Sequence, residues 1–236
     1  DVALLFVGAM SGSPGRPWPN SVSGESFDLS DISLPGCQEE LIRAVKATGK
    51  PTVVVLVAGK PFAMPWVKDN CESVIVQWYG GEQEGRAIAE ILFGEVNPSG
   101  RLNVSFPQST GHLPVYYNYY PSDKGFYHDP GSPEKPGRDF VFSNPDPVWA
   151  FGHGLSYTTF EYKSMQVSGK EFTADGICEI TVEVTNTGKR DGKEVVQLYV
   201  NDVVSSVVTP IKELRRFEKV FIPVGETRKV TFSLPM

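Results

Sequence analysis

The sequence predicts two architectures in succession, an α/β layer with a largely parallel sheet and then an all-β sandwich. In the first half of the chain, short apolar runs alternate with segments of helical period, as in βαβ units. After Phe160, apolar and polar residues alternate with a period of two, as in strands with one buried face. The 23 Gly and 19 Pro also favour turn-rich β structure over helical bundles.

The first two strands are expected at apolar runs. Residues 2–7 form a near-continuous apolar run, typical of a strand buried on both faces in a parallel sheet, and residues 52–57 form another. A helix is predicted between them, over about 38–49, because these apolar residues share one face: Leu41, Ile42 and Val45.

The alternation continues with a short helix over 65–69, a strand over 74–78, a helix over 82–93 and a short strand over 102–106. The longer helix is expected to turn these residues inward: Ala87, Ile88, Ile91 and Leu92. No period persists over about 107–147, which predicts a long ordered connection.

The sandwich strands are predicted from alternating stretches around 178–184, 195–200 and 230–234. An immunoglobulin-like sandwich has roughly seven strands, and fewer fit before Met236. Both ends of the sequence fall in predicted strands, so we expect a longer polypeptide that continues at each end.

Composition and charge argue against several classes of function. The net charge is −6 and no stretch is strongly basic, which argues against a nucleic-acid surface. The longest apolar run, 52–58, is far shorter than a membrane-spanning helix needs. The three Cys and three His are widely spaced, so we expect neither a metal site nor a complete disulfide framework.

One carboxylate on a loop rich in Gly, Ser and Pro is the leading candidate for chemistry. Glu25 follows Gly24 between the first predicted strand and helix, where a rigid α/β scaffold carries functional residues. A loop Glu is ordinarily a solvated surface group, and the pattern alone leaves that alternative open. Asp31 is expected to cap or brace the segment that leads to Pro35. Ser26 lacks the G-x-S-x-G context of a nucleophile.

A second glycine-rich turn, 80–85, resembles a phosphate-binding loop at a helix N-terminus. The G-x-G-x-x-G fingerprint is absent, and Glu82 and Glu84 would repel a phosphate. Close packing of helix and strand is therefore the preferred role for these glycines, and a nucleotide-binding protein is disfavoured.

Several motifs together resemble the C-terminal half of family 3 glycoside hydrolases, the β-glucosidase and β-xylosidase family. The resemblance covers nearly the whole chain, in order: Ser23–Glu25, Ile32–Gln38, Gly49–Leu56, Trp78–Gly85, Ala87–Gly94, Asn97–Leu102, Phe151–Phe160, Val184–Gly188 and Gly192–Tyr199. It implies a three-layer α/β sandwich at 1–107, truncated at its N-terminus, and a long aromatic- and Pro-rich linker at 108–158. A fibronectin type III-like β-sandwich, truncated at its C-terminus, would follow at 159–236.

The resemblance also implies a function, the retaining hydrolysis of O-glycosyl bonds in short β-linked saccharides by two carboxyl groups. Glu25, ten residues before Pro35, matches the family's general acid/base. The family's nucleophilic Asp belongs to a barrel domain that precedes this region, and nothing here resembles that barrel. The chain should therefore need the barrel as a partner and be inactive alone. No metal or other cofactor is implied, and Trp18 and Phe27 are candidate walls around the substrate.

The sequence departs from the family pattern at Asp28 and Leu29, where members with this loop commonly carry Ser-Arg. The missing Arg puts this loop's sugar contacts, and hence the substrate preference, in doubt. A carbohydrate-binding or scaffolding protein that keeps the fold without catalysis is the alternative. The family is compatible with a secreted or periplasmic location, while the sequence itself leaves the compartment unknown.

Overall fold

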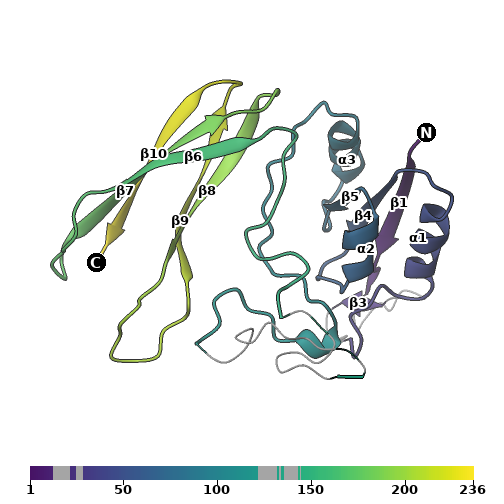
Figure 1. Ribbon diagram of the computed structural model, residues 1–236. Coiled ribbons are helices and arrows are strands. Elements are labelled where there is room, and N and C mark those ends of the chain that lie inside the picture. Colours follow the sequence, from purple (N-terminus) through teal and green to yellow (C-terminus); the bar gives the residue numbers. More distant parts are fainter. Residues whose placement is uncertain (13–21, 25–28, 122–131, 133, 136–142, 144) are drawn as a thin grey trace. The chain divides into compact units, whose positions relative to one another are not determined.

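The computed structural model describes residues 1–12, 22–24, 29–121, 132, 134–135, 143 and 145–236, which form two compact units (Figure 1). Within these ranges, the first unit contains 1–88, 104–117 and 122–151, and the second contains 89–103, 118–121 and 152–236. The first unit is α/β. The second consists mainly of β-strands, as the sequence predicts.

A three-stranded parallel sheet organises the first unit, in the order β1-β4-β5. Its strands are β1 (Ala3–Gly8), β4 (Thr52–Val57) and β5 (Ser73–Val76). The central strand β4 is rich in β-branched residues, which favour strands. Its residues Val54, Val55 and Leu56 are 0% exposed, so β4 lies at the centre of the core.

The strand β1 is an edge strand of the described sheet, and the expectation that both of its faces are buried is wrong. Leu4 is 44% and Phe6 is 55% exposed, whereas Val7 is 6% exposed. Successive side chains of a strand point to opposite faces. The described elements cover only one of these faces, and an apolar run in the sequence does not say whether other elements cover the second.

Three helices follow the strands: α1 (Gln38–Lys46), α2 (Pro65–Asn70) and α3 (Glu84–Leu92). Each buries one residue almost completely: Ile42, Val67 and Ile88. The predicted inward faces are only partly correct, because Leu41 is 49% exposed and Ala87 is also exposed. The apolar contacts of α1 and α3 are therefore narrower than their sequence patterns indicate.

A carboxylate near the amino-terminal ends of these strands joins three elements. Glu72, immediately before β5, pairs with Lys46 of α1, with Oε1 2.5 Å from Nζ. Its Oε2 accepts a 2.7 Å hydrogen bond from the backbone N–H of Thr52 in β4. The hydrogen bond from Lys46 first, and that from Thr52 second, lower the pKa of Glu72 to about 2.

The predicted strand over 102–106 does not form, and Phe106 instead makes an isolated antiparallel bridge with Trp149. The Phe106 ring is fully buried and lies edge-on to that of Trp149, with 5.5 Å between ring centroids. Pro107 follows and has no N–H with which to continue a ladder. The chain then enters a short 3-10 helix, η1 (Thr110–His112).

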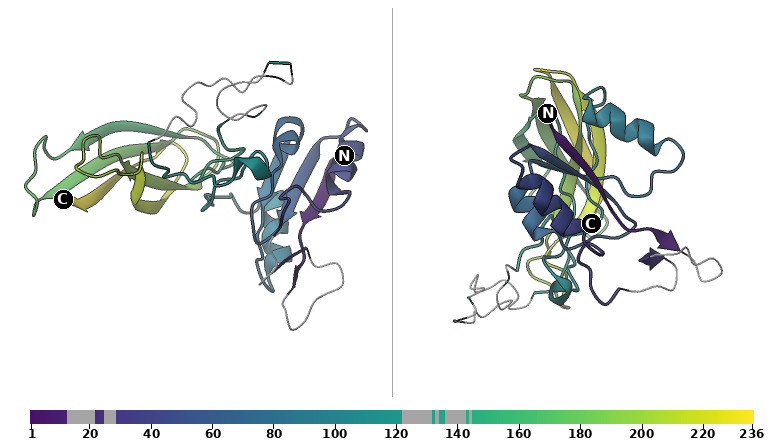
Figure 2. Two further views of the ribbon diagram at one scale, coloured as in Figure 1. Left: turned by 90° about the horizontal axis from the view of Figure 1, so that it is seen from below. Right: turned by 90° about the vertical axis from the view of Figure 1, so that its right-hand side faces the viewer.

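The second unit contains five strands in two sheets, drawn green to yellow in Figure 2. One sheet has the antiparallel order β10-β7-β6, and β8 pairs antiparallel with β9 in the other. Side chains from both sheets share one core: Val184, Val196, Ile222, Val230 and Phe232. The strands are β6 (Phe160–Val167), β7 (Ile177–Asn186), β8 (Gly192–Val200), β9 (Glu213–Ile222) and β10 (Thr227–Pro235).

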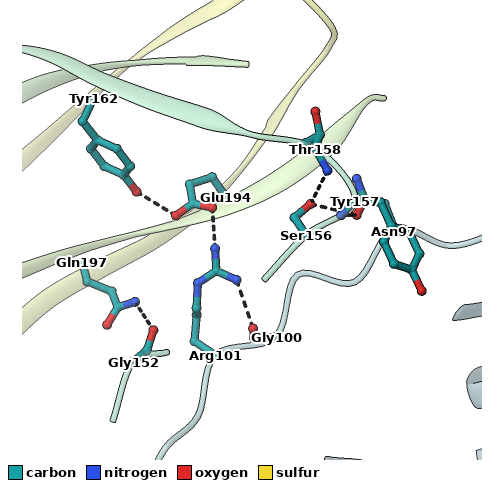
Figure 3. A network of polar contacts seen from close by, with 10 residues as sticks. All are labelled: Asn97, Gly100, Arg101, Gly152, Ser156, Tyr157, Thr158, Tyr162, Glu194 and Gln197. Atoms are coloured by element: carbon teal, nitrogen blue, oxygen red, sulfur yellow. Dashed lines mark hydrogen bonds and ion pairs between the residues drawn. The ribbon is translucent and has the colours of Figure 1, made fainter. Parts of the chain in front are cut away.

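A buried ion pair within this unit fastens the segment after α3 to the sandwich (Figure 3). Arg101 Nη2 lies 2.5 Å from Oε2 of Glu194 in β8, and these side chains are 13% and 9% exposed. The Tyr162 hydroxyl of β6 donates to Oε1 of the same carboxylate at 2.8 Å. Burial first, and then Glu194, raise the pKa of Tyr162, so its hydroxyl remains a donor.

Asn97 makes a second attachment between the same segment and the sandwich (Figure 3). Its Oδ1 accepts hydrogen bonds from Ser156 Oγ and from the backbone N–H of Tyr157, both at 2.8 Å. Its Nδ2 donates to the carbonyl of Asp191 at 2.9 Å. The motif at 97–102 therefore has a structural role, because its polar side chains hold the chain that follows α3.

Replacing Arg101 by Met should lower the free energy of unfolding by about 3–5 kcal/mol, because the carboxylate of Glu194 would stay buried without its cation. Urea unfolding followed by circular dichroism measures this change. The exposed pair Lys163–Glu161, 2.8 Å apart with side chains 54% and 49% exposed, supplies the control. Lys163→Met should cost at most about 1 kcal/mol, and equal losses from the two substitutions would contradict the prediction.

Glu72 should make stability depend on pH in acid. Its folded pKa of about 2 lies below the ordinary value of 4.5, so its contribution is present above pH 4.5 and is lost as the pH falls towards 2. The difference in unfolding free energy between wild type and Glu72→Gln should therefore shrink across that window. A constant difference from neutral pH to pH 2 would contradict it, as would a normal Glu72 pKa in an NMR titration.

Candidate functional site

The candidate site lies at the carboxyl-terminal ends of β1, β4 and β5, which meet at one edge of the parallel sheet. In open α/β sheets, ligands bind at this edge, against the loops that follow the strands. In Figure 1 the arrowhead of β1 points towards β3 (Ser23–Gly24). The loops after the three strands are tied to one another by the contacts below.

The loop after β1 begins at a position that requires glycine. Gly8 has a φ of 144°, and a Cβ there would lie 1.9 Å from the carbonyl oxygen of Val57, so no side chain fits. The amide of Gln38, the first residue of α1, binds both backbone groups of Gly8. Its Oε1 accepts from the Gly8 N–H at 2.6 Å, and its Nε2 donates to the Gly8 carbonyl at 2.8 Å.

The next residue, Ala9, connects the loops after all three strands. Its N–H donates to the carbonyl of Val57 at 3.1 Å, and its carbonyl accepts from the Tyr79 hydroxyl at 2.7 Å. Tyr79 follows Trp78, which has a φ of 59° in the left-handed region. Such a conformation persists only where the surrounding structure requires it, and this turn stands directly before the tyrosine that reaches β1.

The segment that carries Glu25 follows a short parallel pairing. β2 (Ser11–Gly12) pairs with β3, and the Val22 N–H donates to the carbonyl of Met10 at 3.2 Å. Glu25 follows β3 directly in sequence. Glu25, Trp18 and Phe27 lie outside the described residues, so their proposed roles stay predictions.

Beyond this segment, the chain is bound again at residues 31–33. Asp31 Oδ1 accepts from the Ser33 N–H at 2.9 Å and from Ser33 Oγ at 2.8 Å. The expectation that Asp31 braces the segment before Pro35 is therefore confirmed. The two Ser33 bonds, with a smaller contribution from Thr110, lower the pKa of Asp31, which favours its ionised, accepting form.

The glycine-rich turn at 80–85 has a structural role. The Gly80 N–H donates to Glu84 Oε2 at 2.9 Å, and a Cβ on Gly80 would lie 2.8 Å from that of Glu84. Gly81 has a φ of 78°. The close contact is thus with the first residue of α3 itself, and the carboxylate occupies a backbone donor that a phosphate would need.

His112 forms a buried polar contact that sequence reasoning missed. Its ring is 1% exposed, Nδ1 accepts from the Gln108 N–H at 3.1 Å, and Nε2 donates to the carbonyl of Pro145 at 2.9 Å. Among the residues that the structure describes, no three His, Cys, Asp or Glu side chains gather as a possible metal site. None of the described helices is long and apolar enough to cross a membrane.

Two family models match the chain. The glycosyl hydrolase family 3 C-terminal domain matches residues 1–157, and a fibronectin type III-like domain matches residues 194–236. These matches agree with the fold above, an α/β unit followed by a fibronectin type III-like β-sandwich.

Individual relatives are glycosidases. A periplasmic β-glucosidase of Salmonella typhimurium is 40% identical over 99% of this chain and 29% of its own length. A β-xylosidase of Formosa agariphila is 41% identical over 99% of this chain and 30% of its own length. The crystal structure of a β-glucosidase from Listeria innocua in complex with glucose has a TM-score of 0.85 and 35% identity, covering 100% of this chain and 31% of that one. The chain thus spans less than a third of the length of these relatives.

Gln38→Met should lower the free energy of unfolding by about 1–3 kcal/mol, because both backbone groups of Gly8 would lose their partner. Glu40→Met, an exposed position on the same helix, should change it by no more than about 0.5 kcal/mol. Urea unfolding of the two variants beside wild type measures the difference. Equal stability of the two variants would show that the Gln38 amide does not hold the strand end.

Proposed function

The chain belongs to glycosyl hydrolase family 3, and we propose that it supplies the general acid/base of a retaining β-glycosidase acting on short β-linked saccharides. The position of Glu25 carries the proposal. It follows β3 directly and precedes Pro35 by ten residues, as in the family's acid/base loop. The names of the relatives, β-glucosidase and β-xylosidase, support this class of substrate.

In a retaining mechanism, two carboxyl groups act in turn on the same glycosidic bond. The protonated carboxyl of Glu25 gives its proton to the glycosidic oxygen as the bond from that oxygen to the anomeric carbon breaks. A nucleophilic Asp of another domain forms an ester with the anomeric carbon. The Glu25 carboxylate then takes a proton from water as the water attacks that carbon, and the ester bond breaks with the configuration retained overall.

The substrate contacts belong to the same proposal. Trp18 and Phe27 are assigned as apolar walls beside the sugar, since aromatic side chains supply large rigid contact surfaces. Asp28 and Leu29 stand where related loops carry Ser-Arg, so this chain has no guanidinium there for a sugar hydroxyl. We therefore propose a sugar preference that differs from that of members with the Arg.

The proposed nucleophile lies outside this chain, on an N-terminal barrel domain. This arrangement fits the share of about 30% that the chain covers in its relatives. The proposed organisation of the chain itself is an α/β domain at 1–107, a linker at 108–158 and the fibronectin type III-like domain at 159–236. With one carboxyl group of the pair, the chain alone should not turn over a glycoside.

Replacing Glu25 by Ala in the full-length polypeptide should lower kcat/KM for an alkyl β-glycoside by about 10²–10⁴-fold, because the leaving oxygen would depart unprotonated. A dinitrophenyl β-glycoside, whose leaving group needs little protonation, should keep most of its kcat/KM. Added azide should raise kcat of the variant on this activated substrate and give the β-glycosyl azide as product. Steady-state kinetics and product analysis measure these effects.

Glu40→Ala on the exposed side of α1 serves as the control and should leave both substrates unaffected. Equal losses on both substrates for the Glu25 variant, without azide rescue, would contradict the acid/base role. A full-length protein without a barrel Asp and without turnover would favour the alternative, a carbohydrate-binding or scaffolding protein with this fold.

A further inference from the structure

The residue after Asp31 is held through both of its backbone groups by distant parts of the chain. The Ile32 N–H donates to Thr110 Oγ1 at 3.2 Å, and its carbonyl accepts from the Ala63 N–H at 2.8 Å. Ile32 is 8% exposed, so its backbone N–H and carbonyl have little access to water, although Thr110 itself is exposed. A buried backbone group without its partner would be costly, which makes both contacts constraints on where the chain leaves the loop.

The Thr110 hydroxyl uses both of its hydrogen-bonding capacities on this stretch. While Oγ1 accepts from Ile32, it donates to Asp31 Oδ1 at 3.3 Å. The same oxygen of Asp31 accepts the two bonds from Ser33. A single hydroxyl therefore joins two consecutive residues of the loop's exit, at a separation of 78 and 79 residues in sequence.

Thr110 comes from a segment that is itself fixed. It is the first residue of η1, and His112 at the other end of η1 is buried between the backbone of Gln108 and that of Pro145. The side chain of Gln108 also donates to the carbonyl of Asp146 at 3.0 Å. The hydroxyl of Thr110 thus projects from a braced support to the chain that follows Glu25.

We propose that Thr110 is a positioning residue for the general acid/base, because it fixes the exit of the loop whose entry is fixed by the pairing of β2 with β3. The inference rests on the proposed role of Glu25. Glu25 stands one residue after the entry anchor and six before Asp31. A carboxyl group that must reach the glycosidic oxygen depends on both ends of its loop, and small misplacements of such a group are costly in rate.

The dependence of kcat/KM on the leaving group distinguishes a positioning role of Thr110 from a role in stability alone. In a retaining enzyme, kcat/KM reports the first step, the cleavage of the glycosidic bond. Protonation by the acid accelerates this step more when the leaving group is a poorer one. Displacing the acid should therefore reduce kcat/KM for a substrate with a poor leaving group and leave kcat/KM nearly unchanged for a substrate with a good one. A variant that is only less folded loses active enzyme, which lowers kcat/KM for every substrate by the same factor.

The test compares Thr110→Val and Thr110→Ser in the full-length polypeptide. Valine keeps the shape and removes the hydroxyl, whereas serine keeps the hydroxyl. Thr110→Val should lower kcat/KM for an alkyl β-glycoside by about ten-fold or more and for a dinitrophenyl β-glycoside by no more than about two-fold. Thr110→Ser should recover most of the loss. The activated substrate also serves as an internal measure of folded enzyme.

Equal losses on both substrates, or no loss on either, would overturn the positioning role of Thr110. Glu25→Ala is measured in the same series. If that variant shows the leaving-group dependence and azide rescue and Thr110→Val does not, only this inference fails. If Glu25→Ala shows neither effect, the assignment of the acid/base fails and the inference about Thr110 fails with it.

Discussion

The backbone conformation of Gly8 beside Val57 is the constraint on which the carboxyl-terminal edge of the first sheet depends. No Cβ fits at this position, so it requires glycine, and one side chain can bind both backbone groups of Gly8 together. Gln38 does so, and it thereby sets the start of α1 relative to β1. Tyr79 then reaches the adjacent Ala9. The contacts described at this edge are hydrogen bonds to backbone groups, and their strength depends on direction, so they constrain how the loops leave the strands.

The second unit combines the burial of apolar side chains with a buried ion pair. Apolar side chains from its two sheets form the core, and this burial is non-directional. The buried pair of Arg101 and Glu194, with Tyr162 completing the carboxylate's partners, adds direction. A buried ion pair is weak evidence for net stability, because desolvation offsets the attraction between the charges. A shift of the segment after α3 would leave a charge buried without a partner, so the pair disfavours other positions of this segment.

Sequence patterns predicted the elements whose structure depends on neighbouring residues. They failed where a segment distant in sequence determines the burial or the contacts of an element. The buried strand β4, the α1 and α2 helices and the alternation of β7 and β10 follow from period and composition. The alternation in β9 is broken because Leu198 and Tyr199 pair with Arg216 and Leu214, which leaves Arg215 as an extra residue. The exposed face of β1 depends on elements outside that strand. At the candidate site, the bracing role of Asp31 was predictable from its neighbours, whereas its contact with Thr110 spans 79 residues and leaves no local signal.

The loop that carries Glu25, the proposed acid/base, is anchored on both sides by contacts of the described residues. Gly24 pairs with Gly12, and Asp31 and Ile32 are bound by Ser33, Thr110 and Ala63. Lengthening a flexible loop adds little closure entropy, about 0.6 kcal/mol per doubling. An insertion between the two anchors therefore adds little to the conformational entropy that folding must overcome. Under the proposed function, exchanging the loop between Gly24 and Asp31 would therefore change the contacts beside the sugar while the anchors on either side stay in place.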